Sequence, residues 1–132
     1  MKVIIAGSRI LKKYDTVKEA IEKSGFEITE VVSGGNRSHD PVTHLCYGAD
    51  YYGECWAEEN KVPVKRFPPN WDLYGKAAGP IRNREMAEYA DAVIAIRINK
   101  SRGTSNMIEE AQKKNLKIFV LDIEIAPRIA GG

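Results

Sequence analysis

The sequence predicts an α/β fold in which a five-stranded, mainly parallel sheet lies between two layers of helices. Short β-branched runs with the period of strands alternate along the chain with longer segments that have the apolar period of helices. Strands separated by helices are joined by right-handed crossovers, which make them parallel and place helices on both faces. The length of 132 residues suits one modest core, so we expect a single domain over residues 1–132.

The first third of the chain contains two predicted strands and the helix between them. Residues 2–6 form a continuous β-branched run, which is typical of a strand covered on both faces. Residues 15–25 have the apolar period of a helix, with Asp15 suited to its N-cap and Gly25 to its C-terminal stop. Residues 27–35 form the second strand, which ends in glycines.

The middle of the chain adds a helix and a third strand. We expect a helix over residues 49–61, whose buried side comprises Ala49, Tyr52, Cys55 and Trp56. Residues 62–67 form a short strand near an edge of the sheet, because Pro63 has no N–H to donate to a neighbouring strand.

Two further helix–strand pairs complete the predicted sheet. A helix over residues 80–90, with proline at its first position, leads into a strand over residues 91–98. A helix over residues 104–115, capped by its threonine, leads into the last strand over residues 117–123.

Two segments lie outside these elements. Residues 36–48 form a loop far longer than the ~2–6 residues usual between elements, either a functional loop or a surface insertion. It carries side chains of the types that bind zinc, namely His39, Asp40, His44 and Cys46. Their spacing matches no standard zinc site, so we predict no metal site. Residues 124–132 form a C-terminal tail, and we expect its residues 126–132 to be frayed.

Composition limits the classes of partner. Twenty Lys and Arg residues against 18 Asp and Glu residues leave a net charge of +2, which is too balanced to favour nucleic acid or a membrane surface. No apolar run approaches the ~18–20 residues of a membrane span, and the N-terminus does not resemble a signal peptide. Cys46 and Cys55 are too few for a disulfide framework, so we expect reduced thiols and a cytoplasmic protein.

Small polar loops follow three of the predicted strands. In open α/β sheets ligands bind beyond the carboxyl ends of the strands, and glycines there let backbone N–H groups approach an anion. The sequence therefore predicts a phosphate cradle, although each loop alone would also suit an ordinary turn. The three loops are Gly7-Ser8-Arg9, Ser33-Gly34-Gly35 and Ser101-Arg102-Gly103-Thr104.

Motifs of common nucleotide cofactor sites are missing. No G-x-G-x-x-G follows the first strand and no G-x-x-x-x-G-K-[ST] occurs in the sequence, so we predict no cofactor.

Two polar clusters lie near the start of the third predicted helix. Arg82 and Asn83 fall in the first turn of the helix predicted over residues 80–90, where cations oppose the macrodipole. An anionic ligand or a carboxylate would resolve that conflict, whereas the alternative is a solvated pair of arginines, Arg82 and Arg84. Upstream, Trp71 and Lys76 suit either a base-stacking wall with a phosphate-binding lysine or an aromatic lid on the sheet edge.

An ordered set of motifs carries a family resemblance over roughly residues 2–121. "VIIAGSR", "VVSGG", "GAD", the segment from "WAEEN" to "EYADAVIAI", and "SRGTSNMIEEA" together resemble the SLOG superfamily, and most closely its small bacterial and phage members of unknown function. The resemblance implies a Rossmann-like three-layer sandwich that binds a nucleotide or nucleotide-derived ligand. It assigns ligand contacts to Gly7, Ser8, Arg9, Ser33, Gly34, Gly35, Asp50, Arg82, Asn83, Ser101, Gly103 and Thr104. Lys76 and Arg102 are further candidates, because they are cationic and lie in the segments described above.

Three functions follow from this resemblance. The first is a nucleotide sensor or binding module. The second is a phosphoribohydrolase, as in the superfamily's "lonely guy" enzymes, for which Glu109 is the candidate catalytic acid although it follows Thr104 about one turn later than in those enzymes. The third is a single-stranded DNA-binding protein like DNA-processing protein A, which the balanced charge disfavours. Because small Rossmann-like domains often pair through exposed helices, we also expect a homo-oligomer.

Overall fold

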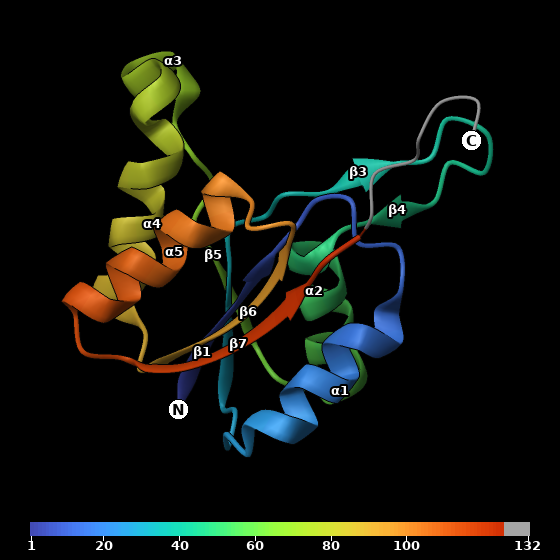
Figure 1. The fold of residues 1–132 in the computed structure, drawn as a ribbon, viewed down its shortest axis with the longest axis horizontal. Helices are drawn as coiled ribbons and strands as arrows, with labels where there is room; N and C mark the ends of the chain where they lie inside the picture. Colours follow the sequence, from blue (N-terminus) through green and yellow to red (C-terminus); the bar gives the residue numbers. More distant parts are fainter. Residues whose placement is uncertain (126–132) are drawn as a thin grey trace.

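The computed structural model describes residues 1–125, which build one five-stranded sheet and a small two-stranded ribbon (Figure 1). The strand order in the main sheet is β5-β2-β1-β6-β7, and every neighbouring pair is parallel. The predicted α/β, Rossmann-like architecture is therefore confirmed. The strands are β1 (Lys2–Gly7), β2 (Glu30–Ser33), β5 (Val64–Arg66), β6 (Ala92–Ile98) and β7 (Lys117–Ile123).

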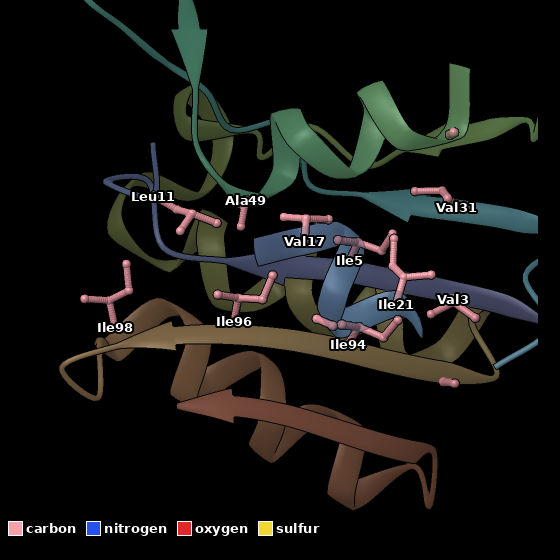
Figure 2. Close-up of a cluster of buried hydrophobic side chains, with 13 residues drawn as sticks. Val3, Ile5, Leu11, Val17, Ile21, Val31, Ala49, Ile94, Ile96 and Ile98 are labelled. Carbon is pink, nitrogen blue, oxygen red and sulfur yellow. The ribbon is translucent and has the colours of Figure 1, made fainter. Parts of the chain in front are cut away.

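Two pairs of helices cover the two faces of the sheet (Figure 1). Val3 and Ile5 of β1 belong to the buried cluster that α1 (Tyr14–Ser24) and α2 (Ala49–Glu59) cover, and Figure 2 shows its side chains between sheet and helices. Ile4 and Ala6 belong to the cluster on the opposite face, under α4 (Ala78–Tyr89) and α5 (Arg102–Lys113). Alternate side chains of one strand thus serve both cores, which explains the uninterrupted apolar run.

Small residues, not aromatic ones, form the buried side of α2. Ala49, Gly53 and Ala57 recur every fourth residue and face the sheet, whereas the predicted Tyr52, Cys55 and Trp56 are only half-buried. A Cβ on Gly53 would lie 2.7 Å from the side chain of Ile5, so the helix packs too closely for a larger residue.

Two helices begin earlier than predicted. α4 starts at Ala78, after a short helix α3 (Trp71–Tyr74) and a 3-10 turn η1 (Gly75–Ala77) that the sequence did not indicate. Pro80 is its third residue, where a missing N–H costs nothing. Arg82 therefore lies beyond the first turn, and the predicted conflict with the helix dipole is wrong.

The start of α5 differs in the same way. α5 begins at Arg102 with Ser101 as N-cap, so Thr104 is not the cap. At α1 the N-cap position is Lys13, and Asp15 lies in the first turn, while Gly25 ends that helix in the left-handed conformation as predicted.

The long loop contains a small antiparallel ribbon, β3 (Ser38–His39) and β4 (Cys46–Tyr47), that projects from the sheet (Figure 1). Its base is tied to the loop after β1, since the Ser38 hydroxyl donates to the carbonyl of Arg9 at 3.1 Å. Cys46 Sγ lies 3.2 Å from His39 Nδ1, but residues 1–125 contain no group of three side chains placed to hold a metal.

The end of the described chain is hydrogen-bonded to the β6–α5 loop. Ile125 donates its N–H to the side chain of Asn99 and accepts from it, at 2.8 and 3.2 Å. The fraying predicted for residues 126–132 falls outside the described part of the chain. Within that part, no helix is long and apolar enough to cross a bilayer.

Candidate ligand-binding cleft

A cleft of about 590 Å³ opens at the carboxyl ends of β1 and β6. The chain builds the sheet from β1 through β2 to β5, and then continues on the other side of β1 with β6 and β7, so this is where the strand order reverses. Loops that leave the two strands toward opposite faces create a crevice at such a point, which is the usual ligand site of open α/β sheets. The lining comes from the end of β1 and the β1–α1 loop, the loop after β2, α2, α3, η1, α4 and the start of α5.

Cations outnumber carboxylates in the cleft. Among the lining residues, one carboxylate, that of Asp50, faces four cationic side chains. The resulting field favours an anion. The cations are Arg9, Lys76, Arg82 and Arg102.

The N-terminus of α5 opens into the cleft without a side-chain cap. The Ser101 hydroxyl donates to Thr104 Oγ1 at 3.0 Å and accepts no bond from a backbone N–H. The first backbone bond of the helix runs from Ser105 N–H to the Ser101 carbonyl, at 3.0 Å. The N–H groups of residues 102–104 thus have no backbone partner in residues 1–125, which is the arrangement that binds phosphate at helix N-termini.

Arg82 is a buried arginine that is only partly satisfied by the protein. Its side chain is 7% exposed. Nη1 donates to the carbonyl of Gly34 at 2.7 Å, and Nε donates to Asn83 Oδ1 at 3.0 Å. Nη2 has no hydrogen-bond partner in the described chain, yet it is not sealed from solvent. Burial lowers the pKa of Arg82 from its usual value, but such a group stays protonated at neutral pH.

Asp50, in the first turn of α2, is a second buried charged residue of the cleft, in addition to Arg82. Only 5% of this residue is exposed, and Oδ2 accepts the Asn36 N–H at 3.1 Å. Burial raises the pKa of Asp50 to about 6, against the lowering effects of that hydrogen bond and of the Arg82 charge. Oδ1 has no hydrogen-bond partner in residues 1–125 and keeps contact with solvent. Arg82 and Asp50 therefore each present one free polar atom to the cleft.

Ser33, Gly34 and Gly35, the predicted part of the loop after β2, do not line the cleft. Ser33 donates its hydroxyl to Glu54 Oε2 at 2.7 Å and accepts the Gly35 N–H at 3.0 Å. A Cβ on Gly34 would lie 2.6 Å from Arg82 Nη1. The structure thus gives this loop a different place from the predicted cradle: it makes room for Arg82 and binds it through the Gly34 carbonyl.

Three other predicted ligand residues line the cleft while also supporting the fold. Gly7 allows the close approach of two strands, since a Cβ there would lie 2.3 Å from the Ile96 carbonyl oxygen. Ser8 is buried and accepts the Ile10 N–H at 3.3 Å. Asn83 connects α4 to α5, because Nδ2 donates to Asn106 Oδ1 at 2.9 Å while Oδ1 accepts from Arg82.

Comparison with known proteins agrees with this architecture. The sequence profile of the YspA, cpYpsA-related SLOG family (YAcAr) matches residues 1–74. This chain belongs to that SLOG family. The Gene 61 protein of Mycobacterium phage D29 is 32% identical over 128 residues, which cover 89% of this chain and 94% of that protein.

The fold of this SLOG protein also resembles a solved structure, that of DNA processing protein A (DprA) from Streptococcus pneumoniae. The TM-score is 0.65 at 22% sequence identity, and the match covers 98% of this chain. This chain spans about half of DprA, 52% of its length. At this identity the likeness concerns the fold alone.

The glutamate singled out as a candidate catalytic acid lies outside the cleft of this SLOG protein. Glu109 is exposed on α5 and is not among the lining residues. The buried face of α5 instead comprises Thr104, Met107, Ile108, Glu110 and Ala111. The neighbouring Glu110 is buried and pairs with Lys113 at 3.2 Å and with Arg84 at 4.0 Å.

Sequence reasoning missed two polar residues that line the cleft, Asn36 and Asn106. Asn36 directly follows the loop Ser33-Gly34-Gly35, and its N–H contacts Asp50. Asn106 lies four residues after Arg102, on the same face of α5. The helical spacing from Arg102 is the signal that would have identified Asn106.

Proposed function

We propose that this cleft binds a nucleotide or nucleotide-derived ligand through its phosphate groups. The observation that carries the proposal is Arg82. A buried guanidinium with a free Nη2 is costly unless a partner arrives, and phosphate oxygens are its preferred acceptors. The open N-terminus of α5 and the side chains of Arg9 and Arg102 offer further donors in the same cleft.

The rest of the ligand has an aromatic surface available. Trp71 on α3 lines the cleft together with Lys76 and is 51% exposed. An indole ring that remains half-exposed beside a cationic cleft suits stacking with a nucleobase. The SLOG resemblance, which implies nucleotide-derived ligands, supports the same interpretation.

Binding without cleavage is favoured over phosphoribohydrolase activity. Cleavage of an N-glycosidic bond develops positive charge on the sugar and needs a carboxylate beside it. Glu109 is exposed and outside the cleft, so it does not support the enzyme hypothesis. We expect no free base when nucleoside monophosphates are incubated with the protein and analysed by chromatography. Release of base that Glu109→Gln abolishes would reverse this preference.

A role in binding single-stranded DNA has weaker support. The name of the S. pneumoniae protein refers to DNA processing, but its likeness to this chain concerns the fold. A net charge of +2 leaves little general attraction for a nucleic-acid strand. A competition experiment with a single-stranded oligonucleotide separates the candidates, because we expect it not to displace a bound nucleotide.

Two measurements test the proposed function. Mass spectrometry of small molecules released on denaturation identifies any ligand that purifies with the protein. Titration calorimetry with pyrophosphate and nucleoside diphosphates then compares the protein with the variants Arg82→Ala and Arg84→Ala. Arg84 lies two residues away on α4 but outside the cleft lining, so it is the matched control. Equal affinities for both variants would contradict the proposal.

The oligomeric state belongs to the same proposal. We propose a homo-oligomer, as small Rossmann-like domains commonly pair through exposed helices. Sedimentation velocity at several concentrations tests it, and a monomer at every concentration would refute it.

A further inference from the structure

The position of Asp50 is costly for the protein alone. A carboxylate that is 95% buried loses most of its hydration. In the described chain it accepts one hydrogen bond in place of the lost water, from the Asn36 N–H to Oδ2. A carboxylate in the first turn stabilises a helix through the helix dipole without being buried. Asp15 shows this, because it lies in the first turn of α1 and is exposed. The burial of Asp50 therefore calls for an explanation other than helix stability.

The unpartnered oxygen of Asp50, Oδ1, indicates why this carboxylate is buried. Oδ1 has no partner in residues 1–125, remains in contact with solvent, and belongs to a residue that lines the cleft. A carboxylate accepts hydrogen bonds and repels phosphate. The part of the ligand beside Asp50 must therefore donate hydrogen bonds, even though the cleft as a whole attracts anions.

The neighbourhood of Asp50 selects the donor. Arg82, which we assign to a phosphate group, lies beside Asp50, because a Cβ on Gly34 would be 2.6 Å from Arg82 Nη1 and 3.0 Å from Asp50 Oδ2. In a nucleotide the group attached directly to the phosphate is the sugar, whereas the base is one sugar away. The aromatic surface suited to the base, Trp71, comes from a different element, α3. The sugar hydroxyls are thus the donors within reach of Asp50.

We propose that Asp50 accepts hydrogen bonds from the hydroxyl groups of a ribose, so that the cleft selects ribonucleotides over their deoxy counterparts. This inference rests on the proposed function of the cleft. It makes a strand of DNA a poor ligand, because DNA lacks the 2′-hydroxyl and its 3′-oxygen is esterified. Asp50 is then a determinant of specificity, while Arg82 and the start of α5 provide the affinity for phosphate.

The experiment compares sugars while the phosphate is held constant. Calorimetry measures the affinities of ADP, GDP, CDP and UDP, of their 2′-deoxy and 3′-deoxy analogues, and of pyrophosphate as a phosphate-only probe. For the base that binds best, we expect at least one deoxy analogue to bind about tenfold more weakly, as the loss of a hydrogen bond to a charged group implies.

Variants of Asp50 make the assignment specific. In Asp50→Ala the preference for ribose should fall to within about twofold, while pyrophosphate binds as tightly as before or more tightly, because a repelling charge is gone. Asp50→Asn keeps the side-chain volume and an acceptor for Asn36, and should reduce the preference several-fold if the alanine variant does not fold. Asp15→Asn, in the corresponding turn of α1, is the matched control and should keep the full preference.

The outcomes separate the two proposals. If neither pyrophosphate nor any nucleotide binds, the proposed function fails and the inference fails with it. If ribo- and deoxynucleotides bind equally, the cleft remains a phosphate site and the assignment of Asp50 is overturned. A ribose preference that survives in Asp50→Ala overturns it as well, because the hydroxyl groups would then be bound elsewhere.

Discussion

Two glycine-containing loops that are similar in sequence have different roles in the structure. Ser33-Gly34-Gly35 and Ser101-Arg102-Gly103-Thr104 both follow strands and both combine glycine with hydroxyl side chains. A Cβ on Gly34 would lie 2.6 Å from the Arg82 guanidinium, whereas a Cβ on Gly103 would meet nothing within 4 Å. The first glycine makes room for part of the protein, and the second leaves room at the mouth of a helix that opens into the cleft. A glycine in such a loop can therefore make room either for another part of the protein or for a ligand, and the sequence alone does not distinguish the two.

The largest effect is expected from a bulky side chain at Gly34. In Gly34→Val the branched side chain would collide with Arg82 and with Asp50 Oδ2, which is 3.0 Å from the Cβ position. We expect a loss of about 3–4 kcal/mol in the free energy of unfolding, from overpacking and from the lost hydrogen bond of Arg82, together with loss of pyrophosphate binding. Urea denaturation and calorimetry measure both. Wild-type stability with wild-type affinity would refute the idea that Gly34 accommodates Arg82.

The second prediction concerns the charge of Asp50, whose carboxylate lies beside Gly34. The folded-state pKa of about 6 exceeds the ordinary value of 3.8, so the folded protein binds this proton more tightly than the unfolded chain does. The ionised form of Asp50 therefore lowers the free energy of unfolding of the wild-type protein above pH 6. This loss disappears as the pH falls toward 4.

Asp50→Asn removes that cost. We expect the variant to be more stable than the wild type by about 2–3 kcal/mol at pH 8, with the difference shrinking toward zero near pH 4. Denaturation at pH 8, 6 and 4 measures the trend. A variant that is less stable than the wild type at pH 8 would mean that the ionised Asp50 stabilises the unliganded fold.

Arg82 is the group that the Gly34 loop holds for the ligand. Arg82→Lys keeps the charge but loses the fork that reaches both the Gly34 carbonyl and the cleft. We expect pyrophosphate affinity to fall by at least ~1.5 kcal/mol, while Arg84→Lys on the same helix leaves it unchanged. Calorimetry on both variants decides the point, and equal losses would show that the Arg82 guanidinium makes no specific contact with pyrophosphate.

The smallest expected change in stability lies at Gly103. Because its Cβ position is open, Gly103→Ala should stabilise the fold by about 0.5 kcal/mol through a lower entropy of the unfolded chain. The same methyl group would obstruct a phosphate that approaches the N-terminus of α5, so affinity should fall although stability rises. Thermal unfolding with and without pyrophosphate measures both effects. Unchanged affinity would show that the ligand stays away from this turn.

Most of the fold follows from local patterns. The β-branched runs at residues 2–6, 91–98 and 117–123 correspond closely to β1, β6 and β7, because strands buried on both faces must be apolar throughout. Pro63 correctly indicated that β5 lies at the edge of the sheet. The helix starts were less predictable, since proline fits several positions of a first turn and a four-residue helix such as α3 has too little periodicity to detect.

The candidate site was predictable in its location and only partly in its members. Residues 7–9 and 101–104 line the cleft because the carboxyl ends of adjacent parallel strands meet at one edge, a rule that the sequence pattern already invokes. Whether an individual side chain faces the ligand depends on helix phase and on packing across elements. Glu109 shows this, because it lies on the exposed face of α5 although its neighbours Ile108 and Glu110 are buried.

Local sequence patterns specify the alternation of strands and helices, and with it the edge of the sheet at which glycines, hydroxyls and arginines gather. Which of those groups already have a hydrogen-bond partner depends on contacts between segments that are distant in the chain. Gly34 is 48 residues from Arg82 in the chain, yet its carbonyl binds the guanidinium and leaves one nitrogen free. Asp50 is buried next to the same arginine with one oxygen unpaired. The unmet hydrogen bonds arise from contacts between distant segments, and no local pattern records them.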